Sequence, residues 1–447
     1  MLESLGLRFR PPANTVMRAD GTGLGATWTL SERAEPARFI LRISRLVAST
    51  PSSSPAQQMD GLVTAANERP ATDTVFKVLD RREFTIAGQP AGLLYTSLRE
   101  GTGDETITAN QGYLLVQTEA NEFIVISSLI AEPDFPAMRA LLDRSFATIA
   151  LITSEEVAKS RADRITAAER LLAGFDEATL RRALDPLPPR ATLPAPRWYR
   201  ISRHLADGTE QESGYMTMMV VEASQGDANP DRQAKDWTPE EKERGILVRL
   251  QARTLLDEKG TMVSDTDSRV WLRWDRAREF WTVRTTARRG RSTRTESQLG
   301  MRLPPSAAHP RGLLQVTGAD TNGTEREKNG LVVTPLSWPV PPVAYLSQAE
   351  SYVLPRLLSA GEPRGAYGFY WYDPRSGRLA LRTDHRSPAR GGFALATQPT
   401  PEAPTMDQEF DAAGVLRRRE TDDGTVIESI EPSKLLELWR RKGLPTG

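Results

Sequence analysis

The sequence predicts an α+β protein in which two folded domains flank a proline-rich seam. Five prolines fall between Asp185 and Arg197. Because each proline lacks a backbone donor and favours extended geometry, we expect a stiff linker over 185–197. On both sides of it, short runs of alternating apolar and polar residues are separated by polar or Gly-containing turns, as in antiparallel sheets. Eight of the nine tryptophans follow the seam, so the second domain is expected to hold most of the large aromatic area.

Composition limits the classes of protein that fit. A chain of 447 residues favours two or three domains. Lys and Arg number 58, as do Asp and Glu, and this balance argues against nucleic acid or an anionic membrane as a partner. Cysteine is absent, which excludes disulfides, thiolate nucleophiles and cysteine-ligated metals. The most apolar stretch, Phe123 to Ala131, is the size of a strand and too short for a membrane span.

Two compartments stay open at this stage. The chain begins on a strand-like segment, Leu5 to Phe9, without a basic and apolar leader before it. The protein is therefore expected to be periplasmic or otherwise extracytoplasmic if a signal peptide has been removed, and cytoplasmic otherwise. The lack of cysteine slightly favours the envelope.

Residues 1–152 are expected to form one α/β domain. A helix over 55–67 places Met59, Leu62 and Val63 at helical spacing behind a first-turn proline. A second helix begins near Pro133 and ends near Ile149. Period-two alternation predicts the strands, which cover 5–9, 26–30, 38–47, 75–86, 91–98, 112–118 and 122–130. Helices placed early and late around antiparallel strands indicate a sandwich.

This order of elements resembles the PsbP-like family. The resemblance covers 1–152 and is carried by an opening Leu-x-Phe-x-x-Pro strand, a Gly-x-Pro-Ala turn, an aromatic strand and a closing Phe-x-x-Ile. These features correspond to Leu7, Phe9, Pro12, Gly88, Pro90, Ala91, Tyr113, Phe146 and Ile149. The resemblance implies an α/β/α antiparallel sandwich that serves as a non-catalytic accessory or binding domain, often in exported proteins. It transfers no site residue.

The first domain offers little for catalysis. Its glycine-rich stretch, Gly21 to Gly25, is interpreted as a hairpin turn, because a phosphate-binding loop would be followed by a helix and a strand follows here. All three histidines, His204, His309 and His385, lie beyond the seam, so no histidine is available here for acid–base or metal chemistry.

Residues 153–184 are expected to form a helical connector. Thr153 and Glu156 have the spacing of a capping box, and apolar residues follow at helical spacing as far as Gly174. A short second helix over 176–184 ends before Pro186. Its charged surface fits a solvated helix that packs by one narrow stripe, and a partner-binding helix is the alternative.

Residues 198–447 are expected to form a curved antiparallel sheet, strongly bent or half closed, with covering helices. Strand pairs joined by polar or Gly turns recur along this part of the chain. Helices are expected near 238–243, over 344–360 with a kink at Pro355, and over 433–441. A curved sheet with a helix on its concave side resembles the LolA-like lipoprotein carriers in topology over about 197–440.

Candidate chemistry in the second domain is sparse. Asp265 and Asp267 are interpreted as a turn rather than a cation site. The arginine cluster is interpreted as an exposed hairpin end rather than a phosphate contact, since Thr, Ser and Gly surround it. Its members are Arg284, Arg288, Arg289, Arg291 and Arg294. No catalytic, metal or cofactor site is expected.

The function predicted from the sequence is non-enzymatic binding in the bacterial envelope, of a hydrophobic ligand or of a protein partner. The candidate ligand surface is a set of aromatic residues on the concave face under the 344–360 helix. The set comprises Trp271, Trp274, Trp281, Phe369 and Trp371. These side chains can serve either as ligand surface or as plain core. A scaffold without a ligand and a hydrolase of unknown type are the alternatives, although no nucleophile and base lie close together in the sequence.

Overall fold

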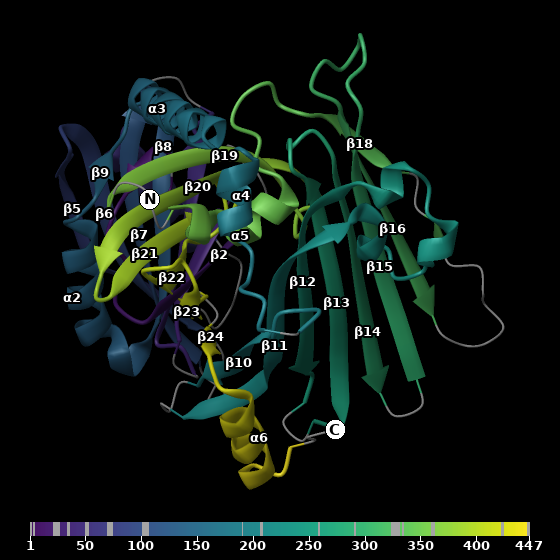
Figure 1. Ribbon diagram of the computed structural model, residues 1–447. Helices are drawn as coiled ribbons and strands as arrows, with labels where there is room; N and C mark the ends of the chain where they lie inside the picture. Colours follow the sequence, from purple (N-terminus) through teal and green to yellow (C-terminus); the bar gives the residue numbers. More distant parts are fainter. Residues whose placement is uncertain are drawn as a thin grey trace. The chain divides into compact units, whose positions relative to one another are not determined.

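The computed structural model describes residues 2, 5–20, 27–33, 36–49, 53–68, 75–100, 107–189, 191–205, 209–257, 260–289, 292–322, 331–332, 335–358, 363–421 and 424–444 (Figure 1). The Gly21 to Gly25 turn, Arg190 and Arg291 lie outside these residues. Contacts divide the chain into two compact units. Unit 1 comprises Met1–Ser160, Leu205–Gly208 and Pro401–Pro404, and unit 2 comprises Arg161–His204, Thr209–Thr400 and Thr405–Gly447.

Unit 1 contains a seven-stranded antiparallel sheet in the order β2-β3-β4-β8-β7-β6-β5. Its strands are β2 (Thr15–Asp20), β3 (Thr27–Glu32), β4 (Phe39–Val47), β5 (Val75–Ile86), β6 (Gln89–Glu100), β7 (Ile107–Glu119) and β8 (Glu122–Ala131). A small pair, β1 (Leu7–Arg8) and β9 (Ala150–Leu151), joins the two ends of the unit. Strand β2 was not predicted, and the predicted opening strand over 5–9 is reduced to the two residues of β1.

One helix covers each face of this sheet. In α1 (Pro55–Asn67), Met59 packs with Leu94 and Leu115. In α2 (Phe135–Phe146), Leu142 and its neighbours pack with the opposite face, to which Leu93 and Tyr95 belong. Leu93 and Leu94 point to opposite sides because side chains alternate along a strand. The start of α1 is fixed by a capping box between Ser54 and Gln57.

The helical segment expected as a connector contributes to the core of unit 2. Helix α3 (Ser154–Ala173) begins with the predicted capping box, in which Thr153 N donates to Glu156 Oε2 at 2.9 Å. Further along, Ala168 and Leu172 of α3 and Leu180 of α4 (Glu177–Arg182) are buried in the main core of unit 2. The division between the units therefore falls at Ser160, inside the segment expected as a separate connector. The apolar stripe of α3 and α4 is wide enough for these helices to form part of the core.

The proline-rich stretch is tied to unit 2 at its start. Asp185 N donates to Val220 O at 2.8 Å, and Val220 N donates to Asp185 Oδ2 at 2.7 Å. Arg197 Nη2 forms an ion pair with Asp185 Oδ1 at 2.6 Å. Asp185 thus holds both ends of this stretch.

Unit 2 is built on a 15-stranded antiparallel sheet, whose long strands β12 to β16 lie side by side in Figure 1. The order is β17-β16-β15-β14-β13-β12-β11-β10-β24-β23-β22-β21-β20-β19, and β18 also pairs with β16. The strands are β10 (Arg197–His204), β11 (Glu210–Ser224), β12 (Arg244–Leu255), β13 (Met262–Arg273), β14 (Glu279–Arg289), β15 (Ser292–Leu303), β16 (Leu313–Asn322), β17 (Leu331–Val332), β18 (Leu336–Pro339), β19 (Gly365–Asp373), β20 (Arg378–Ala389), β21 (Gly392–Gln398), β22 (Met406–Asp411), β23 (Leu416–Glu420) and β24 (Thr425–Ser429).

The sheet bends around helix α5 (Gln348–Leu358). This helix contacts β12, β13 and β14, and its buried residues share one core with Phe369 of β19, Leu395 of β21 and Phe410 of β22. Just before the helix, Tyr345 forms a parallel bridge with Tyr370 of β19. Two distant parts of the sheet therefore meet on the same helix. The mainly antiparallel α+β class predicted from the sequence is confirmed.

Two local predictions in unit 2 are wrong. The helix expected near 238–243 is a single 3-10 turn, Glu240–Lys242, because too few apolar residues follow its cap to pack a longer helix. Asp265 and Asp267 lie within strand β13 and not in a turn. Each carboxylate has an arginine partner: Arg253 Nε to Asp265 Oδ1 is 2.7 Å, and Arg269 Nη2 to Asp267 Oδ2 is 3.0 Å. Cross-strand and same-strand ion pairs allow both aspartates to lie on a strand.

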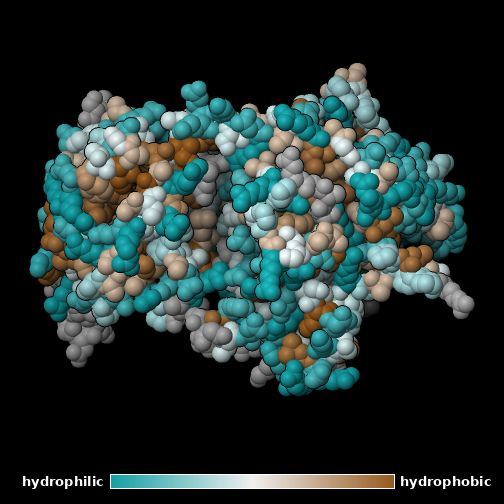
Figure 2. Space-filling model, turned by 60° about the vertical axis from the view of Figure 1, so that its left-hand side comes forward, coloured by the Kyte–Doolittle hydropathy of each residue, from teal (hydrophilic) through white to brown (hydrophobic). Residues whose placement is uncertain are grey.

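The surface agrees with the charged composition. Among the described members of the arginine cluster, Arg284, Arg288, Arg289 and Arg294 are exposed around the β14–β15 hairpin, as expected. On the face shown in Figure 2, hydrophobic residues form patches among predominantly hydrophilic ones. None of the described helices is both long and apolar enough to span a membrane.

Candidate functional site

The five predicted aromatic residues do not share one face of the sheet. Trp274, Trp281 and Phe369 belong to the main core around α5, and Trp371 packs against that core. Trp271 is fully buried on the opposite face, under the short turn η5 (Gln225–Ala228), and its Nε1 donates to Ala223 O at 3.2 Å. In β13, Val270 and Leu272 point to the α5 side, so alternation directs Trp271 away from it. Its grouping with the other four is wrong.

Two of the remaining aromatics are core packing. Trp281 lies 5.6 Å from Tyr372, centroid to centroid, and Tyr372 lies 5.7 Å from Trp338. Gly300, directly opposite Trp281 on β15, leaves room for this indole, and a Cβ there would overlap the ring. Phe369 is fully buried and stacks on Tyr367. These rings fill space between the sheet and α5.

A cavity of about 330 Å³ lies beside α5, inside unit 2. Its apolar wall includes side chains from the inner face of five strands: Met216, Met218, Leu250, Leu395, Phe410 and Leu416. Helix α5 contributes Gln348, Ser351, Tyr352, Pro355 and Arg356. The exposed residues Pro374 and Arg375, in the turn between β19 and β20, also line it. The cavity therefore reaches the surface at this turn.

Trp371 is the predicted aromatic residue that lines this cavity. Its indole Nε1 donates to Pro399 O at 2.8 Å, which fixes the ring in the wall. The guanidinium of Arg382 lies 5.3 Å from the ring centroid, a distance typical of a cation–π contact. The ring thus has one face against a cation and leaves apolar surface for the cavity.

Most arginines of the cavity wall have a carboxylate partner. Arg382 is paired with buried Asp384, with Nε to Oδ2 at 2.7 Å and Nη2 to Oδ1 at 3.0 Å. Arg356 and Arg197 both pair with Asp185 Oδ1, at 3.1 and 2.6 Å. Desolvation lowers the pKa of Arg356, and the charge of Asp185 opposes this effect. These pairs are the expected way to keep a cation inside a protein.

Arg419 of β23 and the exposed Arg375 have no carboxylate partner among the described residues, and Arg419 is the less exposed of the two. The Nε of Arg419 is buried and makes no hydrogen bond there. Desolvation lowers the pKa of Arg419, with a smaller opposing effect from Tyr352. The side chain nevertheless keeps part of its surface accessible and lines the cavity. Protein surrounds the Arg419 side chain, and part of its surface is still accessible. The side chain therefore faces an internal space.

Tyr352 of α5 is the neighbour of Arg419 in this wall. Burial raises the pKa of the Tyr352 hydroxyl, and the charges of Arg419 and Arg382 act against that rise. No hydrogen bond joins this hydroxyl to another described residue. The cavity wall therefore holds a guanidinium and a hydroxyl that influence each other's ionisation, and both groups can donate to an acceptor in the cavity.

A buried polar cluster holds the beginning of α5 in place. Ser347 N donates to Glu350 Oε2 at 2.9 Å and Glu350 N to Ser347 Oγ at 3.2 Å, a capping box, and Glu350 also pairs with Arg276. Glu279 of β14 accepts from Tyr345 Oη and, at 3.1 Å, from Gln348 N. Burial raises the pKa of Glu279 to about 7. This cluster positions the helix that forms one wall of the cavity.

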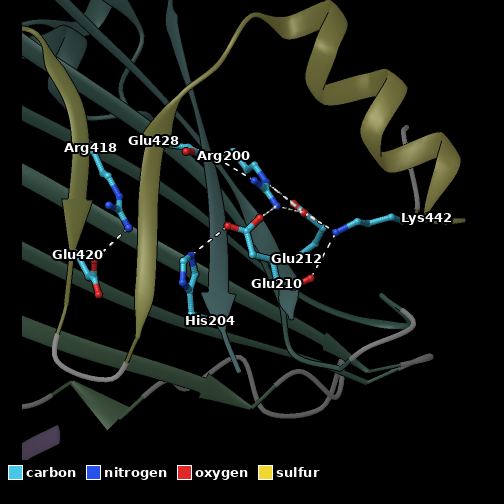
Figure 3. A network of polar contacts seen from close by, with 8 residues as sticks. All are labelled: Arg200, His204, Glu210, Glu212, Arg418, Glu420, Glu428 and Lys442. Carbon is cyan, nitrogen blue, oxygen red and sulfur yellow. Dashed lines mark hydrogen bonds and ion pairs between the residues drawn. The ribbon is translucent and has the colours of Figure 1, made fainter. Parts of the chain in front are cut away.

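The densest ionic network lies on β10, β11 and β24 (Figure 3). Arg200 donates to Glu212 Oε1 at 3.0 Å, to Glu210 at 2.7 Å and to Glu428 at 2.8 Å. Lys442, which follows α6 (Pro432–Arg441), reaches Glu212 at 2.9 Å. Every charge drawn there has a partner, so the network explains how α6 is attached to the sheet and offers no free ligand-binding group.

Sequence reasoning missed Arg419 and Tyr352. A signal for Arg419 is present in the run Leu416-Arg-Arg-Arg-Glu420. Consecutive arginines on a strand place at least one on the inner face. The sequence gives no comparable signal for Tyr352, because an aromatic residue on the buried side of a helix is normally interpreted as a core residue.

Comparisons with known proteins give only weak structural likenesses. No family model matches the chain, and no curated protein is significantly similar in sequence. The structure resembles cyanobacterial PsbP from Synechocystis sp. PCC 6803, with 12% identity over 33% of this chain and 86% of that one, at a TM-score of 0.26. It also resembles LpqN of Mycobacterium tuberculosis, a protein involved in cell envelope biogenesis, with 11% identity, 33% and 83% coverage and a TM-score of 0.24.

A third likeness covers more of the chain. It is to a β-barrel-like protein from Brucella abortus that belongs to a domain family of unknown function, with 11% identity, 54% of this chain, 98% of that one and a TM-score of 0.28. The predicted likeness of a segment to PsbP is thus found again in the structure. TM-scores this low bear on no question of function.

Proposed function

We propose that this is a non-enzymatic binding or accessory protein of the bacterial envelope whose second unit holds a hydrophobic small molecule in the cavity beside α5. The observation that carries this proposal is the cavity itself, about 330 Å³ in volume and lined by the Trp371 ring and by apolar side chains such as Met218 and Leu250. Its volume falls in the range of small-molecule sites, roughly 300–1,000 Å³. Mostly apolar walls with a few polar groups are typical of such sites.

The envelope location is a separate part of the proposal and has its own test. The absence of cysteine agrees with it. Fractionation of cells that carry the natural gene should place the protein outside the cytoplasm, and recovery in the cytosolic fraction would contradict this part alone.

Ligand binding can be tested with a neutral probe and one filled-in variant. Dodecanol added to the wild-type protein should change the tryptophan emission in a saturable way, because Trp371 lines the cavity. Met218→Trp should abolish that saturable binding, since Met218 lines the cavity and the larger ring occupies its space.

Met219→Trp is the matched control. Met219 is the next residue of β11 and packs on the opposite face of the sheet, so its replacement should leave dodecanol binding intact. Thermal unfolding of both variants shows whether each is folded. Equal loss of binding in the two folded variants, or no binding by the wild type, would favour the alternative of a protein partner.

A further inference from the structure

The geometry points to a single-chain amphiphile with a carboxylate head as the occupant of the cavity, with Arg419 and Tyr352 binding the head. This inference rests on the proposed function and specifies its ligand. It follows from two groups in the wall that lack a partner among the described residues and from the size of the cavity.

Arg419 can be compared with other buried or partly buried arginines of unit 2. Arg200 pairs with Glu212, Arg276 with Glu350 and Arg382 with Asp384. Arg386 has no carboxylate but donates to Leu358 O and lies over the Phe393 ring. Arg419 has neither kind of partner among the described residues. A buried cation left without an anion is costly, and a ligand carboxylate would supply the missing anion.

The donors in the cavity wall suit a carboxylate head. A guanidinium presents parallel N–H donors that match the two oxygens of a carboxylate. The hydroxyl of Tyr352 is close enough for its ionisation to respond to the charge of Arg419, and it can donate a further hydrogen bond. Arg375, exposed at the turn where the cavity opens, opposes the charge of Arg419. An anion between them would relieve that repulsion.

The size of the cavity limits the length of the ligand's aliphatic chain. The cavity of about 330 Å³ equals roughly eleven times the ~30 Å³ that a water molecule occupies in the liquid. A methylene group needs a similar volume, so one aliphatic chain of medium length fits and a two-chain lipid does not. The apolar side chains of the wall supply its surroundings, and the unpaired cation supplies the polar end.

The test compares two probes that differ only in the head group, dodecanoate and dodecanol, by isothermal titration calorimetry at pH 8 and below micelle-forming concentrations. Wild-type protein should bind dodecanoate at least tenfold more tightly than dodecanol. Arg419→Gln should weaken dodecanoate binding by about tenfold to a hundredfold, as for a lost charged hydrogen bond, and leave dodecanol binding nearly unchanged.

Two further variants keep the result interpretable. Arg418→Gln removes the neighbouring arginine, which pairs with Glu420 outside the cavity, and should leave both affinities unchanged. Tyr352→Phe keeps the ring and removes only the hydroxyl, so a several-fold loss for dodecanoate alone is expected even if Arg419→Gln fails to fold.

The outcomes separate this inference from the proposed function. Equal affinity of the wild type for the two probes, or equal loss of both probes in Arg419→Gln, would overturn the carboxylate head while the apolar site stands. Absence of binding for both probes would overturn the proposed function and this inference together. Selective binding of dodecanoate that depends on Arg419 supports both.

Discussion

Glu279 is a carboxyl group whose protonation should make the stability of unit 2 depend on pH. It is buried, and burial raises its pKa from an ordinary 4.5 to about 7. The folded protein therefore binds this proton more tightly than the unfolded chain. Its contribution to stability is complete below pH 4.5 and is lost as the pH rises through 7.

Glu279→Gln should reduce this pH dependence, because the amide resembles the protonated carboxyl and does not titrate. A shift of about 2.5 pKa units corresponds to a free energy of unfolding on the order of 3 kcal/mol at most. The measurement is urea unfolding at pH 5 and pH 8 for both proteins. The wild type should lose more stability between the two pH values than the variant, and an equal loss would show that Glu279 does not carry the effect.

Some residues of the candidate site could be predicted from the sequence and others could not. Trp371, one of the five aromatic residues named from the sequence, lines the cavity. Trp271 was placed on the wrong side because two apolar faces, one toward α5 and one toward η5, cover β13, and alternation alone does not say which face meets the helix. Arg419 was missed because it is a candidate ligand-binding residue only if no carboxylate pairs with it. The sequence does not show this, since the carboxylates that could pair with it lie on strands distant in the sequence.

Among the secondary-structure elements, α6 offers a clear contrast between neighbouring residues. Leu435 is 2% exposed and packs with Trp439 and Leu255, whereas Leu436 is 39% exposed. Leu435→Ala should lower the free energy of unfolding by about 2–5 kcal/mol, and Leu436→Ala by about 0.5 kcal/mol or less. Denaturant unfolding of the two variants checks this, and similar losses would mean that α6 is not packed as described.

Elements bounded by caps and turns were the most predictable from the sequence. The predicted Thr153 capping box marks the start of α3, α1 begins at the expected first-turn proline, and β19 and β20 pair across a polar turn, as expected for this part of the chain. The prediction of a helix over 238–243 was wrong because a capping residue starts a helix only where the residues after it can pack. The prediction of a turn at Asp265 was wrong because the acidic pair was interpreted from the residue types alone. The arginines that neutralise the pair in the sheet were not taken into account.

For the whole molecule, the contribution of α3 and α4 to unit 2 changes where the chain can be divided. A fragment of residues 161–447 keeps every core residue of unit 2, and a fragment of 197–447 lacks Ala168, Leu172, Phe175, Leu180 and Ala183. The longer fragment should unfold cooperatively in urea. The shorter should be several kcal/mol less stable or fail to unfold cooperatively, because five buried side chains are removed.

Equal stability of the two fragments would restore the boundary that the prolines suggest, at 185–197. The described residues of 185–196 form neither helix nor strand, and Ala191 N donates to Pro188 O at 3.1 Å, so the stretch includes a turn. The prolines gave no sign that Asp185 binds this stretch to Val220 and Arg356, since those two partners come from other parts of the chain.

The pairing of β10 with β24 has a consequence for how the chain is made. Arg200 and Glu428, which face each other on these strands, are 228 residues apart in the sequence. Most other neighbours in the sheet are joined by hairpins and can associate as soon as they are synthesised. During translation, β10 has only β11 beside it until nearly the whole of unit 2 has left the ribosome. The sheet then forms as two separate ribbons, and contacts this distant in sequence form slowly. One edge of β10 stays open to other chains for most of that time, so the interval before β24 arrives is when this protein is most exposed to aggregation.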